Sequence, residues 1–240
     1  MKNIIIMVLT FLFISCLPGM SAHAVQKNDL PGSIGRNIAA EFKPESAAVR
    51  VKGRTAWIEI NGGTIDGIRI DKMKLLAVLH EVSTVDGSVD SASYLTHMIK
   101  SSIGEVVLAE KDVNDYFKKN ENPEGFSELQ FDFKKEGFSA SGKFRTKIIV
   151  DMELPISAKG VLGLHDDGVY LENTVIKVEG MSQPEFLTNM IVSKLNPLLE
   201  FKDIPFPVTF EKIIMTDKAA IMTGEPKEIK DGETYKWEKL

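Results

Sequence analysis

Apolar and polar residues alternate from Leu129 to Phe144, and this pattern constrains the fold more than any other part of the sequence. Leu129, Phe131 and Phe133 each follow a polar neighbour, and after a Lys-Glu-Gly turn the alternation resumes through Phe138 and Phe144. A period of two places every second side chain on the same face of a strand. We therefore predict a hairpin with one apolar, aromatic face and one polar face, as in an antiparallel sheet with one side in water.

Similar strand patterns occur on both sides of this hairpin. Asn61-Gly62 lies between two β-branched runs, 57–60 and 65–70, and this pair is typical of a hairpin turn because both residues tolerate positive φ. Two further strands are predicted at 73–85 and 89–103, joined at Asp86-Gly87. The chain as a whole indicates about ten strands.

Three short helices are predicted at 29–44, 110–119 and 183–196, where apolar residues recur every three or four positions. Their apolar stripes consist of Ile34, Ile38 and Phe42, of Val113, Tyr116 and Phe117, and of Leu187, Met190, Ile191 and Leu195. Strands and helices do not alternate regularly, so the predicted class is α+β, with a large antiparallel sheet.

The first 24 residues have the pattern of a secretory signal peptide. Lys2 precedes an apolar run from residue 4 to residue 14, and Ala22-His23-Ala24 is a small-x-small cleavage site. The run is shorter than the roughly 20 residues of a bilayer span. We expect cleavage near Ala24 and a periplasmic or other extracytoplasmic location. An uncleaved anchor and a lipoprotein modified at Cys16 are the alternatives.

Cleavage changes what the chain can do chemically. Cys16 is the single cysteine, so a mature chain of about 216 residues has neither a disulfide nor a thiol nucleophile. It retains 28 basic and 34 acidic side chains, a net charge of −6. An acidic chain with a pI near 5.5 gives no electrostatic reason to expect a nucleic-acid partner.

Catalytic motifs are absent from the sequence. His80, His97 and His165 lack metal-ligand spacing, and no G-x-S-x-G is present. Residues 137–143 resemble a phosphate-binding loop, but Phe144 follows the lysine and the segment lies inside a predicted strand. Acid pairs such as 66 with 71, or 166 with 167, are better explained as turn or strand-edge residues. We expect neither a cofactor nor a metal and predict a protein that is not an enzyme, with an unusual hydrolase as an alternative.

The order of segments between Gly63 and Glu225 resembles the LmeA-like phospholipid-binding family. The resemblance is carried by 63–70, by the strand-to-helix step at 105–114, by the hairpin 138–144, by Asn196-Pro197-Leu198-Leu199 and by 204–208. It implies an envelope protein that binds phospholipid in a curved sheet of about ten strands wrapped against two or three helices, similar to tubular lipid-binding proteins. The domain would span 25–225, followed by a frayed charged tail, 226–240.

The apolar faces themselves fit two interpretations, an ordinary closed core or a surface that parts to admit a lipid chain. The resemblance favours a lipid-binding protein with a phospholipid or another acyl-chain lipid as its partner, and it leaves open peripheral contact with the membrane. An envelope scaffold or adaptor with a closed core is the alternative. From periodicity we predict that the lipid contacts Phe131, Phe133, Phe138, Phe144, Leu187, Met190 and Ile191.

Overall fold

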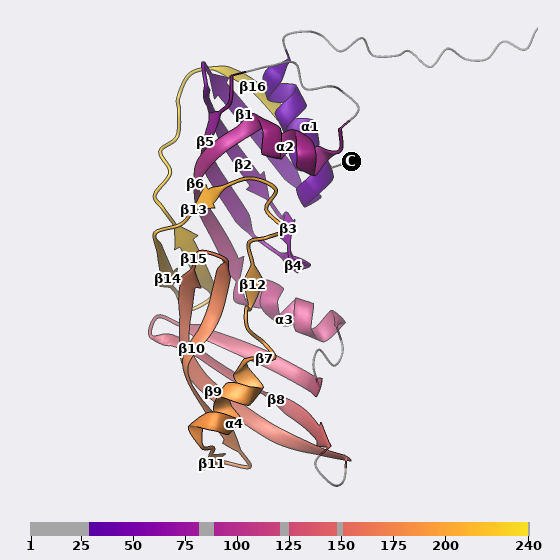
Figure 1. Ribbon diagram of the computed structural model, residues 1–240, viewed down its shortest axis with the longest axis vertical. Coiled ribbons are helices and arrows are strands. Elements are labelled where there is room, and N and C mark those ends of the chain that lie inside the picture. Colours follow the sequence, from indigo (N-terminus) through magenta and orange to yellow (C-terminus); the bar gives the residue numbers. More distant parts are fainter. Residues whose placement is uncertain (1–28, 82–88, 121–124, 148–150, 240) are drawn as a thin grey trace, which may run out of the picture.

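The structure is a computed structural model that describes residues 29–81, 89–120, 125–147 and 151–239. It is an α+β fold in which two antiparallel sheets follow one another along the long axis of the molecule (Figure 1). The predicted signal peptide with Cys16 and the predicted turn at 86–87 lie outside the described residues. The helices are α1 (Leu30–Phe42), α2 (Ser91–Met98), α3 (Glu110–Lys119) and α4 (Glu185–Val192).

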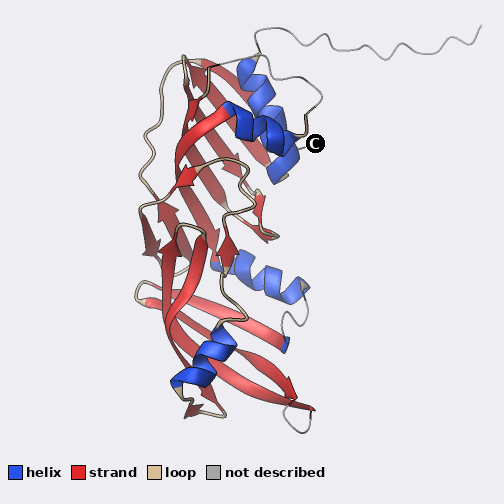
Figure 2. Ribbon diagram, viewed as in Figure 1, coloured by secondary structure: helices blue, strands red, loops and turns tan. Residues whose placement is uncertain are grey.

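The first sheet has eight strands among the described residues, in the order β14-β15-β6-β5-β2-β1-β16, with β13 parallel to β6. These strands are β1 (Ser46–Lys52), β2 (Thr55–Asn61), β5 (Lys72–Leu79), β6 (Ile99–Ala109), β13 (Val208–Thr209), β14 (Lys212–Met215), β15 (Ala219–Thr223) and β16 (Glu233–Glu238). Its inner face carries fully buried aliphatic side chains such as Ile58, Ile60 and Leu75. Helices α1 and α2 lie against this sheet, and α1 packs on β1 and β16 (Figure 2).

Helix α1 follows the predicted apolar spacing. Asp29 caps its first turn, where the carboxylate Oδ1 accepts a hydrogen bond from the Gly32 N–H at 3.0 Å. Ile34, Ile38 and Phe42 are all buried, and Lys43 ends the helix in the left-handed conformation just before Pro44. The prediction of a helix here is confirmed, and so is the prediction of α3.

The second sheet has six strands among the described residues, in the order β11-β10-β9-β8-β7, with β12 paired to β10. These strands are β7 (Phe126–Lys134), β8 (Gly137–Lys147), β9 (Asp151–His165), β10 (Gly168–Val178), β11 (Met181–Ser182) and β12 (Leu199–Glu200). The predicted hairpin forms, because β7 and β8 pair with Phe133 opposite Phe138. Helix α4 crosses the apolar face of this sheet (Figure 1).

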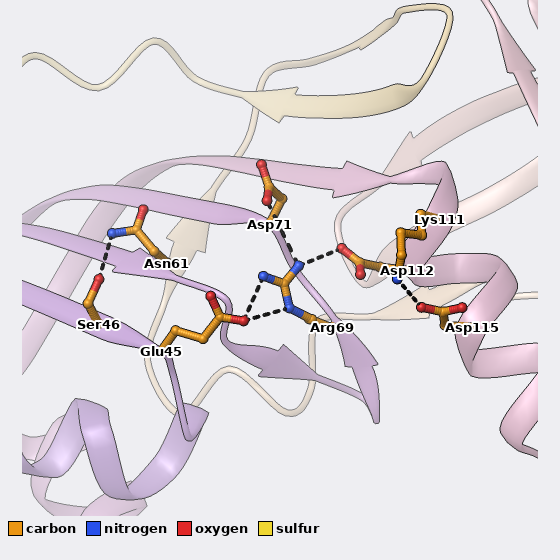
Figure 3. Close-up of polar contacts among 8 residues, drawn as sticks. All are labelled: Glu45, Ser46, Asn61, Arg69, Asp71, Lys111, Asp112 and Asp115. Atoms are coloured by element: carbon orange, nitrogen blue, oxygen red, sulfur yellow. Dashed lines mark hydrogen bonds and ion pairs between the residues drawn. The ribbon is translucent and has the colours of Figure 1, made fainter. Parts of the chain in front are cut away.

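Helix α3 joins the two sheets. It begins directly after β6 and packs on β7, and Arg69 ties it to a two-stranded excursion, β3 (Thr64–Ile65) with β4 (Ile68–Arg69). The Arg69 guanidinium donates to the Asp112 carboxylate at 2.9 Å and to Glu45 at 2.9 Å (Figure 3). The Asp112 side chain is only 6% exposed, so this ion pair satisfies a carboxylate that burial would otherwise leave without a partner.

The single large sheet predicted from the sequence is replaced by these two sheets. The outer edge of β7 is closed by side chains of α3: the Phe133 N–H donates to Glu110 Oε2 at 2.6 Å, and Asn114 binds the backbone of Phe131. A strand edge whose hydrogen-bonding groups are already satisfied cannot pair with a further strand. The two sheets nevertheless share one connected cluster of buried apolar side chains.

The predicted strand at 89–103 is wrong in its first half, which forms α2. Asp90 caps this helix by accepting from the Ser93 N–H at 2.9 Å, and Leu95 and Met98 are its buried residues. The strand β6 then begins at Ile99. The Asp90 cap stabilises a helix in a segment whose isolated apolar residues indicate a strand.

The predicted turn at Asn61-Gly62 is also wrong. Strand β2 pairs with β5, and the residues between them form the β3–β4 excursion. A two-residue type I′ turn needs positive φ at both positions. Gly62 has a φ of 69° but Asn61 is not in that region, whereas Asp66 (50°) and Gly67 (74°) both are. The tight turn therefore forms at Asp66-Gly67.

The C-terminal tail, predicted to be frayed, contains β16. This strand pairs with β1 from Ser46 opposite Glu238 to Val51 opposite Glu233. The Tyr235 ring packs against α1 at Gly35, where an added Cβ would lie 2.4 Å from the ring. Strand pairing on one side and this close approach on the other hold the tail in place.

Candidate functional site: the apolar seam beneath α4

The inner face of the second sheet has small residues at its centre and large ones at its sides. A cross-strand row runs from Phe131 on β7 through Ala140 on β8 and Ala158 on β9 to Ile176 on β10. Residues aligned across a sheet point to the same face. The two central alanines, between a phenylalanine and an isoleucine, make the floor of a shallow trough.

Larger side chains close the trough at both ends. An added Cβ on Gly142 would lie 3.2 Å from Leu129 Cδ1, and one on Gly160 would lie 3.0 Å from Phe138 Cε1. Backbone atoms lie closer still, at 3.0 Å (Leu129 Cα) from the first position and 2.6 Å (Glu172 O) from the second, so both glycines are closely covered by their neighbours. The alanine floor remains between these two covered positions.

Helix α4 forms the roof, and we call the space between it and the floor the α4 seam. Ile191, Val192 and Leu195 point into the seam, and Ile191 is only 4% exposed. The remaining volume is about 20 Å³, close to that of one water molecule. The seam is lined by Phe126, Leu129, Phe131, Phe138, Ala140, Ser141, Ile156, Ala158, Leu171, Thr174, Ile176, Ile191, Val192 and Leu195.

Asparagine side chains bind the backbone of two strands of this sheet, the edge strand β7 and β10 at Leu171, between its short pairings with β12 and β11. Asn114 of α3 accepts from the Phe131 N–H at 2.7 Å and donates to the Phe131 carbonyl at 2.9 Å. Asn196, which follows α4, accepts from the Leu171 N–H at 2.8 Å and donates to the Leu171 carbonyl at 3.1 Å. Each asparagine amide makes the two hydrogen bonds that a residue of a neighbouring strand would make, one as donor and one as acceptor. The two asparagines therefore bind the sheet in the same way.

The residues lining the seam include no ionisable side chain. The seam therefore offers burial of apolar groups and no acid or base. No group of three or more metal-ligating side chains occurs among the described residues. In the same part of the chain, no helix is both long and apolar enough to cross a membrane.

The predicted acid pairs are dispersed among separate contacts. Asp66 accepts from the Glu200 N–H at 3.3 Å, Asp71 lies 3.8 Å from Arg69, and Asp167 accepts from the Tyr170 hydroxyl at 2.8 Å. Partial burial raises the pKa of the Asp66 carboxyl, and the hydrogen bond from Glu200 opposes that shift. None of these acids lines the seam.

The histidines and the loop-like glycine motif also lie away from the seam. His97 contacts the Ser93 carbonyl at 2.6 Å within α2, and His165 pairs with Glu172 at 2.6 Å on the exposed surface. His80 is exposed. Residues 137–143 lie within β8, which continues to Lys147, so no helix begins there to receive a phosphate.

The predicted lipid-contacting residues divide into three groups. Phe131, Phe138 and Ile191 line the seam. Phe133 and Phe144 are buried in the core outside it, and Leu187 is half-buried. Met190 is 46% exposed and belongs to the outer side of α4, where Phe186 is 68% exposed.

Sequence reasoning missed the alanine floor and Val192. Ala140 and Ala158 carry little hydrophobic signal, although each stands between two polar residues of a regular strand, as in Ser139-Ala140-Ser141 and Ser157-Ala158-Lys159. A small residue at an inward position of a regular strand is the signal that would have located the trough.

Comparison with models of protein families, with curated proteins and with solved structures finds no match.

Proposed function

We propose that the mature chain is an exported, non-enzymatic lipid-binding protein of the cell envelope, and that it holds an acyl chain of a phospholipid in the α4 seam. The observation that carries this proposal is the seam itself: an alanine-floored trough between aromatic and aliphatic side chains, roofed by a single short helix. The apparent signal peptide and the resemblance to LmeA-like proteins support an envelope location. On this proposal the second sheet and α4 act like one end of a tubular lipid-binding protein.

The chemistry of the seam suits a hydrocarbon chain and no polar ligand. All but two of its lining residues are apolar, the exceptions being Ser141 and Thr174. Ligand sites of this kind gain affinity from apolar burial, with polar groups near the mouth fixing orientation. The headgroup would therefore remain outside the seam.

Whether an acyl chain can displace the side chains that fill the trough depends on two free energies, the gain from burying the chain and the cost of exposing those side chains. A segment of ten methylenes gains about 8 kcal/mol by leaving water, at about 0.8 kcal/mol per methylene. Exposing a fully buried side chain of this size costs about 2 kcal/mol, so exposing all three of Ile191, Val192 and Leu195 costs about 6 kcal/mol at most, since Val192 and Leu195 are only half-buried. An acyl chain can therefore offset the cost of displacing the three side chains.

The second candidate is an envelope scaffold or adaptor that binds no lipid. The observation in its favour is that α4 fills the trough and leaves only about 20 Å³. In that case the alanines serve only to let α4 pack closely, and the seam is an ordinary part of the core.

The decisive experiment is lipid uptake by the purified mature chain, 25–240, from vesicles of phosphatidylglycerol and phosphatidylcholine, followed by native mass spectrometry. We expect a lipid-bound species whose abundance falls about tenfold in Ala158→Leu, because the added side chain occupies the trough. The control is Ser157→Leu, which adds a similar side chain to an exposed position on the opposite face of β9.

The scaffold candidate predicts the opposite result. A mature chain that is isolated without lipid and takes none from either vesicle would exclude lipid binding. Equal loss of lipid in both leucine variants would show that the seam is not the site. Should Ala158→Leu fail to fold, Ala140→Leu on the neighbouring strand makes the same test.

A further inference from the structure

Helix α4 is attached to the sheet at its two ends. On the N-terminal side, β11 pairs with β10 through Lys177 opposite Ser182, and the Gln183 N–H donates to the Ile176 carbonyl at 2.9 Å. On the C-terminal side, Asn196 binds Leu171 through both of its amide atoms. Both attachments are to the same strand, β10, and they lie on either side of its bulge between Glu172 and Val175.

Between these attachments α4 meets the sheet through side chains. The backbone N–H groups of Leu187, Thr188, Ser193 and Leu195 donate to carbonyls within the same segment. The contact with the trough is made by Ile191, Val192 and Leu195, which line the seam. Apolar contacts are not directional, so this part of the segment can separate from the floor without breaking those hydrogen bonds.

Helix α4 also has apolar side chains on both of its sides. Phe186 and Met190 are four residues apart, hence on the same face, and they are 68% and 46% exposed. Ile191 on the opposite side is buried. When a helix with a single apolar face turns about its axis, its apolar side chains become exposed to water. If α4 turned, Phe186 and Met190 would be buried against the sheet in place of Ile191.

From these three observations we infer that α4 and the turn that follows it form a lid, that Ile191, Val192 and Leu195 of this lid occupy the place of the acyl chain, and that the lid opens about its N-terminal attachment to β10 when its C-terminal attachment releases. The amide clamp of Asn196 is the latch that holds the lid closed. This inference rests on the proposed function, and it adds the step by which the closed seam of about 20 Å³ admits its ligand.

Spin labels report the movement directly, because the single natural cysteine, Cys16, is absent from the 25–240 chain. One label is placed at Met190→Cys on the exposed side of α4 and the other at Ser157→Cys on the outer face of β9. With palmitate bound, the distance between the labels should increase by about 4 Å, the thickness of one aliphatic chain. The control pair is Lys134→Cys with Ser157→Cys, both exposed on the second sheet and neither on α4, and its distance should stay constant.

The latch has a matched control in the same sheet. Asn196→Ala and Asn114→Ala each remove one pair of hydrogen bonds from the backbone of one strand, β10 and β7 respectively. We expect the initial rate of palmitate uptake to rise severalfold in Asn196→Ala only. Should a variant unfold, Asn196→Asp and Asn114→Asp keep the side-chain shape and remove the amide donor.

Failure of the lid and failure of the proposed function give different results. If palmitate binds while the distance from α4 to the outer face stays unchanged and the two asparagine variants take it up at equal rates, the lid is excluded and lipid binding stands. If neither palmitate nor vesicle lipid binds to the natural chain, the proposed function is excluded together with the lid.

Discussion

The two sheets of this chain solve the same packing problem in different ways. The first sheet has large aliphatic side chains at the centre of its inner face, including Ile58 and Leu75, and the 13-residue helix α1 covers part of it with Ile34 and Ile38, all fully buried. The second sheet has alanines at its centre and is roofed by the 8-residue helix α4. Similar antiparallel pairing thus produces a closed core in one case and, in the other, a seam that we propose opens to admit an acyl chain.

One substitution in the apolar packing of each sheet tests this comparison most strongly. Ile58→Ala removes a fully buried side chain from the closed core and should lower the free energy of unfolding by about 4 kcal/mol. Ile191→Ala makes the same change at 4% exposure on the buried side of the short helix α4, which can settle into the space, and should cost about 2 kcal/mol. Urea unfolding monitored by circular dichroism measures both values. Equal losses would show that the α4 seam is packed as firmly as the closed core of the first sheet.

A smaller effect tests the junction that holds the two sheets together. Arg69→Met leaves the buried Asp112 carboxylate without its ion pair and should lower the free energy of unfolding by about 3 kcal/mol. The matched control is Lys111→Met on the same helix, whose partner Asp115 and own side chain are 43% and 80% exposed. Because an exposed ion pair contributes little, this control should leave the free energy of unfolding nearly unchanged. A similar cost for both variants would mean that Arg69 is no more than a surface ion pair.

The sequence predicted the regular elements better than their assembly. Spacing at Ile34, Ile38 and Phe42 located α1, and alternation at Phe131 and Phe133 located β7, because both patterns reflect burial on one face. Division into two sheets depends on Glu110 and Asn114 reaching the edge of β7, a contact between residues that no periodicity connects. The order of the strands therefore could not be predicted from local patterns.

The tail and the lid show where weak patterns were misread. Tyr235 and Trp237 alternate with charged and polar residues, and both are partly buried in β16, so the strand signal was present inside a segment dominated by charge. In α4, Met190 and Ile191 are adjacent and point about 100° apart around the helix axis, and the structure buries Ile191 while Met190 is 46% exposed. Burial of one neighbour over the other depends on the position of the sheet beneath them.

The seam was predicted only in part, for a reason that concerns size. Phe131 and Phe138 were identified because large apolar residues mark an inward face. The trough exists because Ala140 and Ala158 are small, and a small side chain contributes too little apolar surface to stand out in a sequence. The two alanines are far apart in the sequence and become neighbours only when β8 pairs with β9. The trough between them therefore has no signal in either strand alone.

The measurement that tests the central claim most directly is photo-crosslinking with a palmitate analogue that carries a diazirine near the middle of its chain. The account predicts adducts on the seam, at Ala140, Ala158 or Ile191 and their lining neighbours. Adducts confined to outward positions such as Ser139 and Ser157, or to the first sheet, would contradict it.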